Sequence, residues 1–349
     1  MVPVVDLSRR ADALAAPFHE VVARVLASGH VLLGPELAAL ESELAAWCGD
    51  AHVVGVSSGA AAIQLALTAL GIGPGDEVLV PAFTAVPTAS AVCAIGATPV
   101  FVDVDAATAT VPANGWEAAR TDRTKAVIVV HLYGRPAEAP ATDLPVIDDA
   151  AQAHGALRPG RASAATVYSF YPTKNVGGIG DGGAITSDDE KLAGTIRRLR
   201  VHGMTEQYVH VDRSQNFRLS ELEAGWLRLS LPTLPATTAR RREITAAYRA
   251  AAPELRWQAD HPDHVHHLAV FRADDRPATR EQLAASGVAS AVHYPLALTQ
   301  QPAYRELTRG ACPEAEAWAG SCVTVPCFPE LSDAEVEQVL DALGALTRG

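Results

Sequence analysis

One lysine of this chain lies between an aromatic segment and a run of glycines. Only three of the 28 lysine and arginine residues are lysines, at 125, 174 and 191, and Lys174 falls in SFYPTKNVGGIGDGG, residues 169–183. A lysine buried beside a flat ligand has a lowered pKa, so its amine is a nucleophile that forms imines; arginine cannot do this because it stays protonated. A solvated lysine in a surface loop is the alternative, and the flanking aromatic residues and glycines disfavour it.

Two adjacent carboxylates supply a second chemical group. Asp148 and Asp149 end the apolar part of VIDDAAQAHG, residues 146–155, and ligands of open α/β sheets bind beyond the carboxyl ends of strands. Neighbouring strand residues face opposite sides, so the two side chains are not expected to form an acid pair. One is expected to point into a site while the other caps the next turn. The alternative is that both only cap turns.

A third segment has the features of an anion-binding site. SSGAAAIQ, residues 57–64, places two serines and a glycine between an apolar segment and a helical one. The free amides and positive dipole end of such a helix bind anions, and Ser58 adds a hydroxyl. A simple capped helix is the alternative. Together the three segments supply what pyridoxal 5'-phosphate (PLP) requires: a seat for phosphate, an acid for the pyridine nitrogen and an amine for the aldehyde.

These segments need a scaffold of alternating strands and helices. Short apolar segments alternate with helical ones from residue 53 onward, which predicts an α/β fold with a mostly parallel sheet and helices on its faces. The predicted strands are 53–57, 77–81, 99–104, 126–132, 145–149, 166–170 and 183–187, and the predicted helices include 60–70 and 84–95. The connection 133–144 is short and holds two prolines, so no full helix is expected there.

The pattern changes near residue 230, and the length of 349 residues favours two domains. We expect a large cofactor-binding domain over 1–230, N-terminal segment included, and a small α+β domain over 231–349. Within the small domain the sequence predicts strands at 267–273 and 288–295. A closing helix is expected at 332–346, with Ser332 as its N-cap.

The bulk composition excludes several classes of protein. A net charge of −12 argues against general nucleic-acid binding. The sequence contains no uninterrupted run of eighteen apolar residues, so no membrane span is predicted. The amino terminus has no signal-peptide pattern. Five cysteines, an odd number without a C-x-x-C pair, indicate reduced thiols and a cytoplasmic location.

The chain resembles the DegT/StrS-type family of PLP-dependent sugar aminotransferases nearly end to end. The most specific segments are IDDAAQAHGA (147–156) and YSFYPTKNVGGIGDGGAITSDD (168–189), in that order, with SSGAAAIQLAL (57–67) before them. The resemblance implies a fold-type I transferase of the aspartate aminotransferase kind, with a mixed, mostly parallel sheet and a small C-terminal α+β domain. It also implies a homodimer with a shared active site.

Residue by residue, the resemblance implies a set of roles. Lys174 forms an imine with PLP and then moves a proton between substrate and cofactor. Asp149 keeps the pyridine nitrogen protonated, and Gln152 hydrogen-bonds the phenolic oxygen of the ring. Phe83 lies against the ring face. The phosphate seat is implied to consist of Ser58, Gly59, Ala60 and Ser169, with Asn216 from the second subunit.

Members of this family commonly transfer the amino group of L-glutamate or glutamine to a nucleotide-linked keto sugar or a keto-cyclitol. The segments HLYGRPA, FYPTKN and GDGG are most similar to branches that aminate carbon 3 of a dTDP-linked 3-keto-6-deoxyhexose. A keto-cyclitol aminotransferase is the alternative. A non-catalytic sensory or assembly relative is disfavoured because the lysine and the acid are intact. The residues expected near the substrate are Tyr208, His210, Arg218, His293 and Tyr294.

Several features depart from the family pattern or lie outside it. Ala60 stands where many relatives have threonine, Gln215 replaces a common glycine, and Phe217 replaces a smaller residue. The alanine and arginine content suggests amino-sugar and antibiotic biosynthesis. His264 and His266 alternate in HVHH, but no third ligand is evident beside them, so no metal site is expected.

Overall fold

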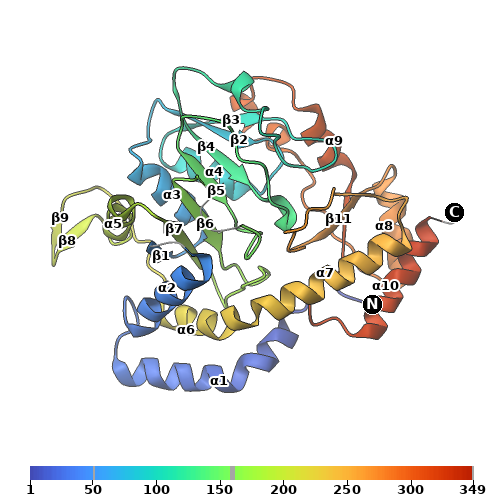
Figure 1. Cartoon of the computed structure of the whole chain (residues 1–349), viewed down its shortest axis with the longest axis horizontal. Coiled ribbons are helices and arrows are strands. Elements are labelled where there is room, and N and C mark those ends of the chain that lie inside the picture. Colours follow the sequence, from blue (N-terminus) through green and yellow to red (C-terminus); the bar gives the residue numbers. More distant parts are fainter. Residues whose placement is uncertain (50–51, 158–161, 348–349) are drawn as a thin grey trace.

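The computed structural model describes residues 1–49, 52–157 and 162–347, and its centre is a seven-stranded sheet (Figure 1). The strand order is β1-β7-β6-β5-β4-β2-β3. Strands β6, β5, β4, β2 and β3 run parallel, and β7 is antiparallel to both β1 and β6. The strands are β1 (His52–Val56), β2 (Glu77–Pro81), β3 (Thr98–Val102), β4 (Thr124–Val130), β5 (Val146–Asp149), β6 (Ala165–Ser169) and β7 (Gly183–Ser187). The predicted α/β class and all seven predicted strands are confirmed.

Alternation along these strands divides the large unit into two cores. In β1, Val54 and Val56 face one core while Val53 faces the other. In β6, Val167 and Tyr168 are divided in the same way, because successive side chains of a strand point to opposite faces. Helices cover both faces, as an α/β sheet requires.

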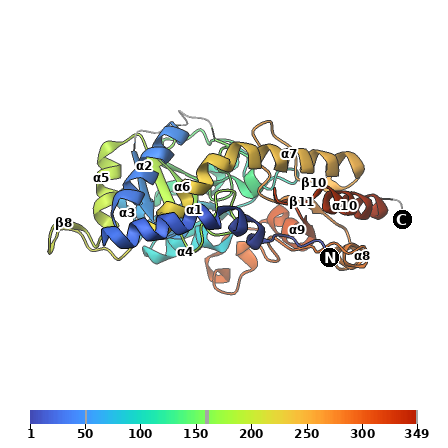
Figure 2. The ribbon, with the colours of Figure 1, turned by 90° about the horizontal axis from the view of Figure 1, so that it is seen from below.

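The helices of the large unit lie around this sheet (Figures 1 and 2). They are α1 (Leu7–Ser28), α2 (Pro35–Cys48), α3 (Gly59–Ala69), α4 (Val86–Ala94), α5 (Glu190–Leu199) and α6 (Glu221–Ser230). Gly29 ends α1 in the left-handed conformation that a C-cap glycine adopts readily. The connection after β4 contains only a short 3-10 turn, Leu132–Gly134, so the prediction that no full helix forms there is confirmed.

A long helix, α7 (Leu234–Ala251), leads into a smaller unit with a three-stranded antiparallel sheet (Figure 2). Its other elements are β10 (Arg256–Trp257), β11 (Ala269–Arg272), α8 (Arg276–Ala285), α9 (Pro313–Ser321), β12 (Cys322–Val325) and α10 (Asp333–Leu346). Ser332 caps α10 and forms a capping box with Glu335, as predicted. Val2 packs in the core of this unit. The domain boundary near 230 stays a prediction.

The predicted strand at 288–295 is wrong. This segment makes only isolated bridges, Val2 with Val288 and Ala291 with Thr324. After Ala291 the chain leaves the edge of β12, and the His293 imidazole hydrogen-bonds the Thr324 hydroxyl at 2.9 Å. The segment therefore delivers His293 and Tyr294 to a cavity instead of continuing the sheet.

A two-stranded hairpin of β8 (Met204–Glu206) and β9 (Val209–His210) projects from the body of the molecule beside α5 (Figures 1 and 2). Its residues 205–210 are exposed. Among the described residues, no helix combines the length and the apolar character that crossing a membrane needs.

Candidate active site

A cavity of about 530 Å³ lies at the carboxyl ends of the parallel strands. Val130, Asp149 and Ser169 are the last residues of β4, β5 and β6, and all three line it. This is where ligands of open α/β sheets bind. The predicted site residues that line the cavity are Ser58, Gly59, Ala60, Asp149, Gln152, Ser169, Lys174 and Tyr294.

The anion seat is the amino end of α3. Ser58 is the N-cap, and its hydroxyl accepts a hydrogen bond from the Ala61 amide at 3.0 Å. A Cβ at residue 59 would lie 2.8 Å from the Ser169 Cβ, so only glycine lets the helix approach β6 this closely. The amides of Gly59 and Ala60 precede the first hydrogen bond inside the helix, so they and the helix dipole suit a phosphate.

Asp149 is the acid of the cavity. It is 5% exposed, and its carboxylate accepts hydrogen bonds from the Thr88 hydroxyl at 3.0 Å and the Ala151 amide at 3.1 Å. Burial raises its pKa, against the two hydrogen bonds and the charge of Lys174. A buried carboxylate is stabilised by a cationic partner, which suits a protonated pyridine nitrogen.

Asp148 faces the other side of the strand, as predicted. Its carboxylate lies 3.0 Å from the His131 Nε2, and both side chains are fully buried. The His131 Nδ1 accepts a hydrogen bond from the Ala137 amide at 2.9 Å, so the proton lies on Nε2 and is donated to Asp148. One expectation is corrected: Asp149 both lines the cavity and caps the next turn through Ala151, whereas Asp148 braces the connection after β4.

Gln152 is held by two partners. Its carbonyl oxygen accepts a hydrogen bond from the Tyr133 amide at 2.6 Å, and its nitrogen donates to the Tyr294 hydroxyl at 2.9 Å. The first contact fixes which end of the amide is the donor, because a backbone amide can only donate. The amide nitrogen carries two hydrogens, so the one that does not bond Tyr294 remains available to an oxygen of a bound ring.

Lys174 follows β6 in a tightly packed turn. Its amide donates to the Tyr171 carbonyl at 2.8 Å, and its carbonyl accepts from Arg10 at 3.0 Å. A Cβ at residue 177 would lie 2.2 Å from the Pro172 carbonyl oxygen, so the close return of the chain requires Gly177. The glycines after the lysine thus allow the turn to pack closely against neighbouring segments. Lys174 therefore lies in a packed turn and not in a solvated surface loop.

The amine of Lys174 has a perturbed pKa. Burial lowers the pKa to about 8, against the attraction of Asp149. Burial and the charge of Lys174 also lower the pKa of the nearby His293 to about 4. The lysine is therefore partly unprotonated near neutral pH, which a nucleophile or a base requires.

A second cavity of about 230 Å³ adjoins the first and shares Gln152, Lys174 and Tyr294 with it. His293, predicted near the substrate, lines this second cavity, as does the buried His267. The lysine thus stands between a cavity that suits the cofactor and a smaller one beside it.

Phe83 does not line either cavity. Its fully buried ring stacks on Trp318 and contacts Tyr133 and Tyr294 edge-on. The expected contact of Phe83 with the cofactor ring stays a prediction. The strand β2 ends at Pro81, and the residues after Phe83, namely Thr84 and Ala85, line the cavity instead.

Four other predicted residues do not line the cavity of their own chain. Tyr208 is 84% exposed in the hairpin, and His210 is exposed beside it. Asn216 is exposed, and its side-chain oxygen accepts a hydrogen bond from Arg218 at 2.9 Å. Their expected roles stay predictions that need a second subunit. Of the unusual residues near them, Gln215 is exposed and Phe217 is buried in the large core.

Sequence reasoning missed several cavity residues. Thr88 is the most informative, because its hydroxyl contacts both Asp149 and, at 3.4 Å, Thr84. Thr84 precedes α4, and Thr88 lies in the first turn of that helix. In the predicted helix 84–95 their four-residue spacing would place them on one face, so the spacing was a usable signal. Tyr171, one of the aromatic residues that flank Lys174, and Asp181 also line the cavity, and nothing in the sequence marked Asp181.

A third group that could ligate a metal lies beside the two histidines of HVHH. Asp260 lies beside His264 and His266, with an oxygen or nitrogen of each residue within 4.8 Å of the others. The sequence analysis found no third ligand because an exposed aspartate in a loop carries no signal by itself.

The whole chain is similar to known aminotransferases. A profile of the DegT/DnrJ/EryC1/StrS aminotransferase family matches residues 13–344. The chain is 41% identical over 360 residues to the "dTDP-3-amino-3,4,6-trideoxy-alpha-D-glucose transaminase" of Streptomyces venezuelae, covering 98% of this chain and 95% of that protein.

Solved structures agree with this match. DesV of S. venezuelae in complex with a ketimine intermediate has a TM-score of 0.94 and 38% identity, covering 100% of this chain and 99% of that one. NtdA of Bacillus subtilis with the bound cofactor PMP has a TM-score of 0.93 and 27% identity, covering 100% of this chain and 85% of that one.

Proposed function

The chain belongs to the DegT/DnrJ/EryC1/StrS family of PLP-dependent aminotransferases, and from this premise we propose that it transfers the amino group of L-glutamate or glutamine to a dTDP-linked keto-deoxysugar. The observation that carries the proposal is the second cavity, which shares Lys174, Gln152 and Tyr294 with the cofactor cavity. A keto carbon bound there lies beside the lysine. The full-length similarity to a transaminase of a dTDP-linked amino sugar supports the choice of acceptor.

The residues of the larger cavity fit PLP, which supplies the electron sink for amino transfer when bound. The amides of Gly59 and Ala60 with the Ser169 hydroxyl would hold its phosphate. The Asp149 carboxylate would hold the ring nitrogen, and the Gln152 nitrogen would hold the ring hydroxyl oxygen. Ala60 offers no hydroxyl, so the phosphate depends more on backbone amides.

Lys174 is the residue that moves a proton. Its Nζ is partly unprotonated near neutral pH, because burial lowers its pKa to about 8, and it lines both cavities. It can therefore take a proton from a substrate carbon in the smaller cavity and return one. Neutral His293 and His267 beside it add no charge, because burial lowers their pKa values.

The proposal includes a homodimer in which the hairpin of one chain completes the site of the other. Support comes from Tyr208, His210, Asn216 and Arg218, none of which lines the cavity of its own chain. An exposed aromatic ring and a guanidinium would suit a nucleotide base and its diphosphate. A cytoplasmic location is also part of the proposal and rests on the cysteine pattern of the sequence.

An acceptor panel tests the reaction. The PLP-loaded protein is incubated with glutamate or glutamine and with one acceptor at a time: a dTDP-linked 3-keto-6-deoxyhexose, a UDP-linked 3-keto sugar or an inosose. We expect the aminated dTDP-sugar to form fastest, detected by its mass. Turnover of inosose alone would establish the cyclitol alternative instead, and a preference for the UDP-sugar would correct the nucleotide.

Mixing two inactive variants tests the shared site. Lys174→Ala and Asn216→Ala damage different halves of a shared site, so a heterodimer retains one intact site. Random exchange of subunits should then restore about a quarter of the wild-type activity. If each site lies within one chain, mixing would restore nothing.

A further inference from the structure

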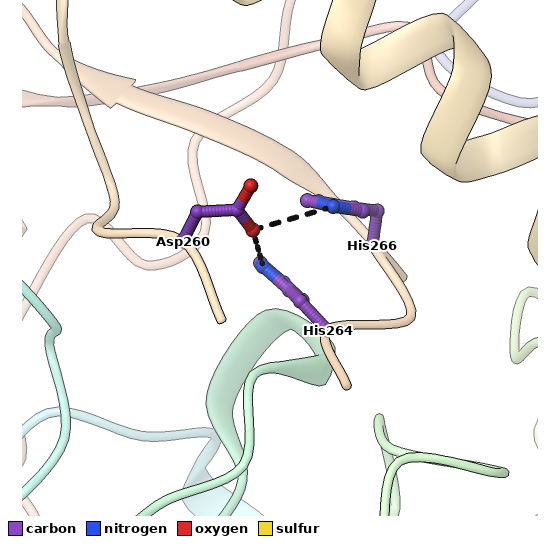
Figure 3. Close-up of side chains that lie close together, drawn as sticks. All are labelled: Asp260, His264 and His266. Carbon is purple, nitrogen blue, oxygen red and sulfur yellow. Dashed lines mark ion pairs between the residues drawn. The ribbon is translucent and has the colours of Figure 1, made fainter. Parts of the chain in front are cut away.

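The loop before β11 gathers three groups that ligate metals. Asp260, His264 and His266 come together beside the Tyr133 turn, and Figure 3 shows both imidazoles directed at the same carboxylate oxygen. The side chains of His264 and His266 are 1% and 7% exposed, whereas that of Asp260 is 56% exposed. Two buried nitrogen ligands thus meet one carboxylate that reaches solvent.

The distances between the carboxylate and the two imidazoles fit a small cation bound between them better than direct hydrogen bonds. Oδ1 of Asp260 lies 3.5 Å from Nδ1 of His264 and 3.6 Å from Nε2 of His266. Both distances are longer than an ordinary hydrogen bond. In a tetrahedral zinc site, metal–ligand bonds of 2.0–2.1 Å place neighbouring ligand atoms about 3.3 Å apart. A contraction of a few tenths of an ångström would bring the oxygen and each nitrogen to that separation.

The hydrogen bonding of His264 leaves its inner nitrogen unsatisfied. Nε2 lies 3.3 Å from the Tyr133 carbonyl oxygen, which can only accept, so Nε2 carries the proton. The lone pair of Nδ1 then faces the Asp260 carboxylate, and the buried Nδ1 has no hydrogen-bond partner among the described residues. Two acceptors that face each other repel unless a proton or a cation lies between them.

Both imidazole side chains are buried, and the neutral imidazole is the form that binds a metal. The cations of Arg249 and Arg242 act on His266, and the Asp260 carboxylate is the opposing charge.

The backbone holds the two rings together at a cost. His266 has a φ of 43°, in the left-handed region that residues other than glycine rarely adopt. The ring centroids of His264 and His266 are 3.8 Å apart. This local conformation keeps the two imidazoles side by side next to the Asp260 carboxylate.

We propose that Asp260, His264 and His266 bind one divalent transition-metal ion, for which Zn²⁺ is the best match, with water in the fourth position. Two imidazoles and one carboxylate match a borderline cation, whereas Mg²⁺ and Ca²⁺ prefer oxygen ligands throughout. The Tyr133 carbonyl is the outer partner that fixes the tautomer of His264. The nearby arginines weaken the affinity without removing it, because Asp260 contributes a full negative charge.

The metal has a structural role in this proposal. The Val265 amide donates to the Gly134 carbonyl at 3.0 Å, and the neighbouring Tyr133 amide holds Gln152. An ion held by His264 and His266 ties down the loop on either side of Val265. It therefore stabilises the Tyr133 turn that holds Gln152, and it does not contact the reacting atoms.

Zinc titration of the PLP-loaded protein tests this site, after treatment with a chelator and dialysis. Isothermal titration calorimetry with ZnCl₂ is expected to give one tight site per chain in the wild type. Asp260→Asn and His266→Gln should each weaken binding at least tenfold, since each removes a ligand. Asp263→Asn is the matched control, because it removes a carboxylate from the same loop, and it should leave binding unchanged.

A second measurement separates this site from other ligands. Zinc should raise the melting temperature of the wild type and of Asp263→Asn but not that of Asp260→Asn, because only a folded site binds. The absorbance of bound PLP confirms that each variant is folded. Absence of zinc binding in the wild type would overturn the proposal, as would wild-type zinc affinity in both Asp260→Asn and His266→Gln.

Discussion

The cofactor cavity and the β8–β9 hairpin are built in opposite ways. Asp149 is buried and hydrogen-bonded, and the chain after Lys174 returns so closely that Gly177 cannot carry a side chain. In the hairpin, Tyr208 is 84% exposed and lacks such support. The difference teaches that one chain holds its own lysine and acid in place, whereas the Asn216 contact and recognition of the acceptor, as we propose them, require a second chain.

Lys174→Ala should cause the largest loss of activity of the variants at the cofactor cavity. Without the amine there is no group to move the proton, and general acid–base catalysis contributes on the order of 10²–10⁴ to the rate. We expect activity to fall at least a thousandfold while PLP is still retained by the phosphate seat. Activity and the absorbance of bound PLP measure this. The exposed Lys191→Ala is the control and should behave like the wild type.

Asp149→Asn and Asp148→Asn separate the two faces of β5. The first keeps the shape and the contact with Thr88 but cannot hold a pyridine nitrogen protonated, so kcat should fall on the order of 100-fold. The second disturbs the buried pair with His131, so it should lower the melting temperature with a smaller effect on kcat. Equal losses of kcat in the two variants would contradict the assignment of roles.

The stability of the cofactor-free protein should depend on pH through Lys174. Its folded pKa of about 8 lies below the ordinary value of 10.5, so the unfolded chain binds more protons between these values. Stability should therefore rise as pH increases from about 8 to about 10.5, by about 3 kcal/mol. Urea unfolding of the wild type against Lys174→Met measures the difference, and this rise should be missing from the variant. Parallel curves would contradict the lowered pKa.

Tyr208→Ala should give the smallest effect, and it tests whether the hairpin binds the acceptor. Loss of an aromatic contact with the acceptor is worth about 1–2 kcal/mol, so KM for the sugar nucleotide should rise roughly tenfold. The half-reaction with the amino donor should be unchanged, because the lysine and acid are untouched. Single-turnover measurements with each substrate distinguish the two. A fall in the donor half-reaction would show that the hairpin supports the cofactor cavity after all.

Local pattern was sufficient for most of the fold. The seven strands of the large sheet follow from short apolar segments separated by turns and helices, and each is present. The segment 288–295 was mistaken for a strand because it is short and largely apolar. Its place is decided by the contact of His293 with Thr324, which lies 31 residues away.

The sequence by itself determined the chemistry of the site. A scarce lysine among glycines, an acid at a strand end and a serine–glycine helix start each leave a local signal, because strand ends and helix starts are set by nearby residues. Only the tertiary structure decided that Asp148 pairs with His131, that Thr88 supports Asp149, and that Asp260 meets His264 and His266. Those facts depend on how distant segments pack, and packing leaves no mark in the order of neighbouring residues.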